Sequence, residues 1–100
     1  MTVRSPFKPH YGSNQVVTPG AASASITISK DDKSLRVVNT GANIGYFRTG
    51  TGSVTASAAD VPVPAGGSIV IEKPQEHDKL AHISASGTTF QVMTGEGGFV

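Results

Sequence analysis

The sequence predicts an all-β fold, namely a small antiparallel β-sandwich or jelly-roll-like barrel of about seven short strands with an extended N-terminal arm. Three observations lead to this prediction. The 100 residues include 11 Val and 6 Ile but only 2 Leu, and β-branched residues favour strands. Apolar residues recur at every second position in several short segments. Turn-forming residues separate these segments roughly every 8–12 residues, and no apolar pattern of helical period interrupts them.

The segments with this alternation lie between residues 24 and 94. We expect strands at 24–29, 34–39, 44–48, 61–64, 68–73, 80–85 and 88–94, and a weaker strand at 54–56. The prolines in 61–64 restrict that segment to a sheet edge, because proline has no N–H for the ladder.

Turn chemistry and side-chain phase add finer expectations. The polar turn 30–33 predicts a hairpin between the first two strands, and Ser86-Gly87 predicts another between the last two. In the strand 80–85, we expect Ala81, Ile83 and Ala85 to point into the core.

The N-terminal part differs from the rest. Residues 1–22 contain Pro6, Pro9, Pro19 and several glycines and show no strand or helix period, so we divide the chain into an extended N-terminal arm (1–22) and a β-sandwich domain (23–100). Two interpretations of the arm remain open. It is either a disordered terminus or a segment that becomes ordered on a neighbouring subunit.

Composition excludes several classes of protein. The chain has no Cys, so it has no disulfide, thiol nucleophile or cysteine-based zinc site. No stretch approaches about 18 apolar residues, and the N-terminus lacks the apolar centre of a secretory signal. A net charge of +1 gives no basic excess for direct nucleic-acid binding. Val, Ile, Leu and Phe are few, so the core should be thin and completed by partner subunits.

Motifs for chemistry are weak, and we expect no catalytic residue, no metal ligand set and no cofactor. There is no G-x-S-x-G, and the glycine-rich segments 50–52 and 95–98 lack the spacing of a phosphate cradle. Glu76-His77-Asp78 reads as a solvated turn, and His82 is expected to face solvent or a partner. Tyr46-Phe47-Arg48 reads as a core aromatic beside a surface arginine rather than a stacking platform.

Apolar side chains in the two termini predict an interaction surface instead. In the arm, we expect Phe7, Tyr11, Val16 and Val17 to be apolar anchors, with Arg4 and Lys8 facing an acidic surface of the partner. At the C-terminal tip, we expect Phe99 and Val100 to contribute.

Several motifs resemble those of small proteins encoded among the structural genes of tailed bacteriophages. They are R-V-x-N-x-G within 35–42, R-x-G within 46–50, A-D-x-P-V-x-A-G at 59–66, the segment 81–88 and a closing G-x-G at 95–97. The resemblance covers about residues 34–98, so it does not include the arm.

The resemblance implies a non-enzymatic structural virion protein, most plausibly a capsid-decoration (cement) protein. Such a protein is made in the host cytoplasm and lies on the surface of the phage head. It binds the major capsid protein as a homo-oligomer, with a trimer favoured, and needs no cofactor and no membrane. A head–tail connector or tail-associated protein is the alternative. A carbohydrate-binding host-attachment module is a weaker one, because the chain has 2 Tyr, 4 Phe and no Trp for stacking on sugars.

Overall fold

The computed structural model describes residues 7–96, which form nine strands and no helix. The strands are β1 (Lys8–Pro9), β2 (Gln15–Val17), β3 (Ala24–Thr27), β4 (Ser34–Asn39), β5 (Gly45–Gly50), β6 (Val61–Val63), β7 (Ser68–Glu72), β8 (Lys79–Ile83) and β9 (Phe90–Glu96). Among these residues, no helix is present that could cross a membrane.

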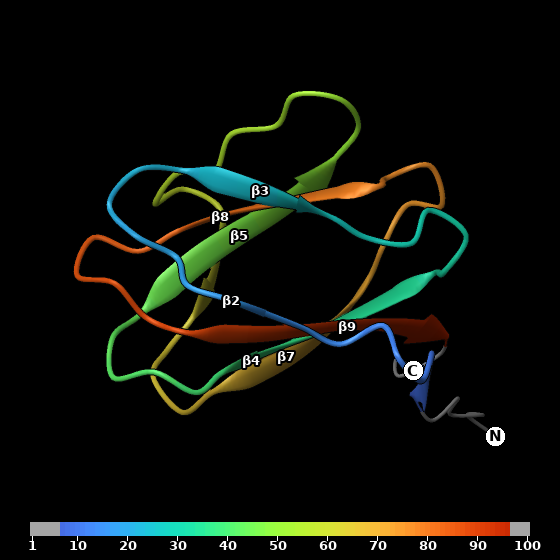
Figure 1. Cartoon of the computed structure of the whole chain (residues 1–100), viewed down its shortest axis with the longest axis horizontal. Helices are drawn as coiled ribbons and strands as arrows, with labels where there is room; N and C mark the ends of the chain where they lie inside the picture. Colours follow the sequence, from blue (N-terminus) through green and yellow to red (C-terminus); the bar gives the residue numbers. More distant parts are fainter. Residues whose placement is uncertain (1–6, 97–100) are drawn as a thin grey trace, which may run out of the picture.

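The strands form two antiparallel sheets that pack face to face as a sandwich (Figure 1). Sheet A has the order β1-β9-β4-β7, with β2 also pairing with β9, and sheet B has the order β3-β8-β5-β6. From β2 onward, each successive strand lies in the other sheet, except that β6 follows β5 in sheet B. This alternation is a jelly-roll-like arrangement, so the predicted fold class is confirmed.

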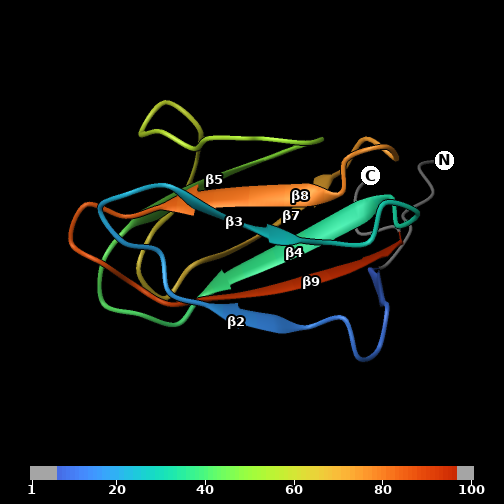
Figure 2. The same ribbon diagram turned by 45° about the horizontal axis from the view of Figure 1, so that its top comes forward.

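The two predicted hairpins are wrong. β3 pairs with β8 rather than β4, and β8 pairs with β3 and β5 rather than β9. Both connections instead cross from one sheet to the other (Figure 2). The apolar face of each strand must be buried against the opposite sheet, about 10 Å away, and local turn signals contain no information about that crossing.

Most strand positions agree with the alternation in the sequence. β4 has the predicted bounds, and the other predicted strands from 24–29 onward shift by at most a few residues. The weak strand at 54–56 does not form, and residues 51–60 are a loop instead. β1 and β2 lie within the predicted arm, where proline and glycine obscured any period.

The core lies between the sheets and is small but well buried. Leu35, Val37, Phe90 and Val92 enter it from sheet A, and Phe47, Val63 and Leu80 from sheet B. Val17 and Ile28 complete the cluster of buried residues. Phe47 and Phe90 are fully buried, and Phe47 is the core aromatic expected in the segment Tyr46-Phe47-Arg48.

The predicted phase of β8 is wrong. Leu80, His82 and Ser84 point inward, so His82 is 5% exposed instead of facing solvent or a partner. Ala85, predicted to point inward, is exposed.

The cause lies on the outer face of sheet B, where the 51–60 loop covers the strands (Figure 1). Its Ala56 N–H donates to Ser23 Oγ at 2.8 Å, and Arg48 Nη1 lies 3.8 Å from Asp60 Oδ1. Ala81 is therefore buried although it faces outward. Its apolar side chain indicates burial correctly but does not show which face of the sheet it lies on.

At one end of the sandwich, the buried side chain of Asn39 joins two loops to the end of β6. Its Nδ2 donates to the carbonyls of Asn43 (2.8 Å) and Val63 (2.9 Å). Its Oδ1 accepts from the Gly41 N–H (2.9 Å) and from Thr88 Oγ1 (2.7 Å). All four bonds are made in a site that is 1% exposed, so the amide fixes the ends of β4 and β6 and both neighbouring loops.

We expect Asn39→Ala to destabilise the fold by about 2–4 kcal/mol, because it leaves buried carbonyl and N–H groups without partners. The check is urea denaturation followed by circular dichroism. Asn14→Ala is the control: Asn14 is exposed with one bond of 3.3 Å to Gln91, and its loss should change stability by less than about 0.5 kcal/mol. Equal effects in both variants would contradict the role given to Asn39.

Candidate binding surface

Residues 7–17, here called the N-terminal segment, lie along the edge of sheet A. β1 pairs Lys8 with Glu96 and Pro9 with Gly95, and β2 pairs residues 15–17 with residues 92–90 of β9. Between the two strands, a turn at 10–13 includes Gly12 with φ 87°, a left-handed conformation that suits glycine. The segment therefore extends the sheet of its own chain.

The C-terminal end of this segment and the residues after it are packed into the domain. Val17 is 8% exposed and belongs to the core, and the Pro19 side chain is fully buried. The carbonyls of Pro19 and Gly20 accept from the N–H groups of Thr88 (3.1 Å) and Ser84 (2.8 Å). Val17 thus packs inside its own chain, and the accessible part of the segment lies before it.

The structure distributes the other predicted anchors differently. Tyr11 is 85% exposed and Val16 is 64% exposed, Lys8 is also exposed, and Phe7 is half-buried. Arg4, Phe99 and Val100 lie outside the described residues. Tyr11 and Val16 are two of the three exposed large hydrophobic side chains of residues 7–96, so the segment concentrates the exposed apolar surface.

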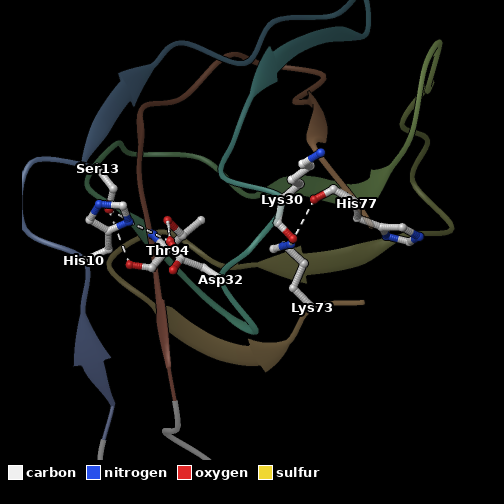
Figure 3. A network of polar contacts seen from close by, with 7 residues as sticks. All are labelled: His10, Ser13, Lys30, Asp32, Lys73, His77 and Thr94. Carbon is white, nitrogen blue, oxygen red and sulfur yellow. Dashed lines mark hydrogen bonds and ion pairs between the residues drawn. The ribbon is translucent and has the colours of Figure 1, made fainter. Parts of the chain in front are cut away.

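A polar network holds the turn of the segment to the domain (Figure 3). His10 Nδ1 lies 2.8 Å from Asp32 Oδ2, and Thr94 Oγ1 donates to the same oxygen at 2.7 Å. The Ser13 hydroxyl lies within hydrogen-bond distance of the backbone N–H and C=O of Thr94. We call these four residues the latch.

The latch favours an ionised Asp32. Partial burial by itself would raise the pKa of Asp32, but hydrogen bonds from Thr94 and His10, the charge of His10 and a hydrogen bond from Ser29 together lower this pKa below its usual value. Above its usual pKa, the carboxylate therefore stabilises the folded chain, and this stabilisation is lost as the pH falls through the lowered pKa.

The packing beneath the segment is incomplete. A cavity of about 280 Å³ lies between the segment and β3, lined by Gly12, Ser13, Gln15, Thr27, Ile28, Ser29, Val92 and Thr94. Gln15 Nε2 crosses this gap to the Thr27 carbonyl at 2.7 Å. Hydrogen bonds, rather than apolar packing, thus hold residues before Val17 in place.

A second polar network lies at the same end of the sandwich as the latch (Figure 3). It centres on Lys73, whose side chain is fully buried. Its Nζ donates to the carbonyls of His77 (2.9 Å), Pro74 (3.2 Å) and Lys30 (3.4 Å). Burial lowers the pKa of Lys73, while the charges of Asp32, Asp31, Asp78 and Glu96 raise it and partly offset that effect. The ammonium joins the 28–33 and 74–78 loops, so its role in this geometry is structural.

The outer face of sheet A continues the exposed surface. A shallow pocket of about 510 Å³ is lined by Asn14, Arg36, Val38, Thr40, Gln91 and Met93. Val16 lies directly opposite Gln91 in the ladder and so on the same face. This face and the N-terminal segment together are the candidate binding surface, whereas the 51–60 loop covers the outer face of sheet B.

Residues 7–96 contain no group of three His, Asp or Glu side chains placed to hold a metal ion. In the 76–78 turn, His77 Nδ1 bonds Thr49 Oγ1 at 2.8 Å instead. The His82 Nδ1 is buried without a hydrogen-bond partner next to Phe47, and desolvation lowers the pKa of this imidazole.

No protein-family model and no curated protein sequence matches the chain. Two solved structures share a general likeness. One is a cupin-2 domain protein from Shewanella frigidimarina, with a TM-score of 0.48, 8% identity, and coverage of 93% of this chain and 82% of that protein. The other is a cupin domain protein from Bordetella pertussis, with a TM-score of 0.44, 17% identity, and coverage of 95% and 98%. Neither likeness assigns a family or a residue role to this chain.

The latch does not follow from any local pattern in the sequence. Asp32 belongs to a polar turn, and nothing near Ser13 or Thr94 indicates a polar network. Asp32 and Thr94, which are bonded to each other in the latch, are 62 positions apart in the sequence. No local pattern reports such a contact, since it exists only after β9 and the N-terminal segment pair.

We expect Asp32→Ala to release the turn of the N-terminal segment, because His10 and Thr94 Oγ1 both lose their common acceptor. Amide hydrogen exchange of His10 and Ser13 should accelerate several-fold, with a loss of about 1–2 kcal/mol of global stability. Asp31→Ala, at an exposed neighbouring carboxylate, is the control and should leave both amides unchanged. The latch would be refuted by unchanged exchange in Asp32→Ala.

We expect His82 to make the fold less stable in mild acid. Its pKa in the folded state is lowered from 6.5, so the unfolded chain binds more protons and the free energy of unfolding falls as the pH drops through the unfolded pKa. In His82→Leu, urea denaturation between about pH 5 and pH 7 should show a smaller dependence on pH. His77→Gln retains His82 and should retain the acid loss, and the same slope in all three proteins would contradict this assignment.

Proposed function

We propose that this protein is a non-enzymatic structural protein of a tailed-phage virion that decorates the head and binds the major capsid protein through its N-terminal segment and the outer face of sheet A. The observation that carries the proposal is the exposure of Tyr11 and Val16 on a segment fixed to the domain at Val17. Large apolar side chains presented in this way are typical of sites that a partner covers.

The sequence motifs add the class of partner. Those at 35–42, 59–66 and 81–88 resemble small structural proteins of tailed phages. In the structure, these motifs correspond to β4 with the Asn39 loop, β6 with its flanking turns, and β8 with the turn after it. Jelly-roll folds serve many functions, including viral capsids, so the fold is compatible with the proposal without selecting it.

The charge of the surface fits an acidic partner. Lys8 and Arg36 are both exposed, one on the N-terminal segment and one in the centre of the outer face. On the outer face itself, the pocket lining contains amide, hydroxyl and apolar groups and no carboxylate among the described residues. A coat surface with acidic residues around an apolar depression would complement this arrangement.

A binding assay with expanded capsids that lack the protein tests the proposal. We expect saturable co-sedimentation, and we expect Tyr11→Ser combined with Val16→Ser to weaken binding about tenfold or more, because two buried apolar contacts are lost. Ile44→Ser is the matched control. Ile44 is the third exposed large hydrophobic side chain, at 44%, but it precedes β5 of the other sheet.

Three outcomes separate the alternatives. Saturation at many copies per particle, with loss only in the double variant, supports a decoration protein. Saturation at a few copies per particle favours the head–tail connector. The absence of any capsid binding, or an equal loss in the Ile44→Ser control, overturns the role given to the N-terminal segment.

A further inference from the structure

The sheet edges of this sandwich are protected unequally. Exposed edges are normally blocked by proline, by short strands or by a covering side chain, because their unpaired backbone groups attract other strands. Here β6 has Pro62 at its centre and β1 has Pro9. β2 has three residues, and the Thr27 carbonyl on β3 is covered by the Gln15 side chain. Among the described strands, β7 is the edge that lacks such a feature.

The backbone of β7 presents a regular set of hydrogen-bonding groups. The Lys73 N–H donates to the Lys33 carbonyl and the Asn39 N–H donates to the Gly67 carbonyl, both at 2.8 Å, and the register between them is unbroken. Successive residues of a strand direct these groups to opposite sides. The N–H and C=O groups of the odd-numbered residues therefore point toward β4. Those of Ser68, Val70 and Glu72 point away from the sheet.

The side chains along this edge are apolar at the centre. Ile69 and Ile71 pack against the core but remain half-exposed, and Val70 is half-exposed on the outer face, opposite Arg36. Ser68 and Glu72 at the two ends are exposed. The edge is thus a five-residue strand with an apolar middle and polar ends.

We propose that β7 is the contact site for a second copy of this chain, which adds its own β7 in antiparallel orientation across a two-fold axis at Val70 and forms a dimer instead of the trimer that the resemblance implies. The sequence of the strand is complementary to itself in this register. Ser68 lies opposite Glu72 of the second copy, Ile69 lies opposite Ile71, and Val70 lies opposite Val70. The outward-facing residues 68, 70 and 72 become the hydrogen-bonded pairs that an antiparallel ladder needs.

The electrostatics agree with this register. Each Glu72 carboxylate meets a Ser68 hydroxyl, which can donate to it, and the two Glu72 residues lie at opposite ends of the contact. A parallel or shifted register would bring the two carboxylates closer or leave isoleucines facing solvent. The pairing would join the two copies of sheet A into one continuous sheet.

This contact is independent of the proposed capsid binding. β7 and the N-terminal segment lie at opposite edges of sheet A, with β4 and β9 between them. A dimer made through β7 therefore leaves Tyr11 and Val16 of both copies open.

Sedimentation velocity over a wide micromolar range tests the contact. We expect a concentration-dependent rise toward twice the 10.2 kDa of one chain. Val70→Glu should abolish it, since two carboxylates would face each other at the axis, whereas in the single chain the new carboxylate faces Arg36. Val38→Glu is the matched control: it adds the same charge on the same outer face, in the interior strand β4, and should retain the dimer.

Amide hydrogen exchange identifies the strand. The amides of Ser68, Val70 and Glu72 should be protected at high concentration and should exchange rapidly on dilution. Val70→Pro removes one outward N–H without touching the ladder to β4, so it should weaken the dimer and leave the fold unchanged. The proposal is overturned by a monomer at all concentrations, by a mass near three chains, or by a dimer in which these amides stay unprotected.

Discussion

The pairing of β9 on both of its edges is the contact on which the rest of this structure depends. β9 bonds β4 along one side and the N-terminal segment along the other. The same strand supplies Phe90 and Val92 to the core and Thr94 to the latch. Because one strand is shared by the core, the sheet and the segment, displacing it would remove the support for the candidate binding surface as well as part of the core.

Polar networks at the two ends complement a core with few large side chains. At one end, the Asn39 side chain makes four hydrogen bonds that join two loops to the end of β6. At the other end, Lys73 and Asp32 join the 28–33 loop to the 74–78 loop and to the N-terminal segment. Fully satisfied buried polar groups specify one arrangement, because any shift leaves a donor or acceptor unpaired. Hydrogen bonds of these three side chains therefore hold the loops that they contact in one arrangement.

The sequence was a good guide where a single strand decides its own structure. The strand expected at 34–39 has the same bounds as β4, and the core aromatic expected in Tyr46-Phe47-Arg48 is Phe47, which is fully buried. Prediction from the sequence failed where a segment packed on the strand determines which side chains are buried. Ala81 is buried by the 51–60 loop, which reversed the inferred phase of β8 and concealed the inward orientation of His82.

The same distinction explains the remaining failures. The polar turn at 30–33 looks like a hairpin turn, yet the chain crosses there to the other sheet. The pairing partners, β8 for β3 and β9 with β7 for β4, are all distant in the sequence, so a local turn signal does not identify them. The N-terminal segment showed no period because proline and glycine interrupt it, although Val16 and Val17 alternate between solvent and core once β9 provides a ladder. The binding roles of Phe7, Lys8, Tyr11 and Val16 remain predictions.

The two edges of sheet A differ in how the chain covers them, because the sequence has few large apolar side chains. At the β9 edge, the chain covers its own strand with residues 8–17 and leaves Tyr11 and Val16 facing out. At the β7 edge, no strand within residues 7–96 bonds the outward-pointing N–H and C=O groups of Ser68, Val70 and Glu72, and Ile69 and Ile71 remain half-exposed. Covering both edges internally would require another strand, and residues 7–96 supply none. A partner at each edge would supply the missing burial. The two partners need not be the same, because the β9 edge offers exposed apolar side chains and the β7 edge offers backbone N–H and C=O groups.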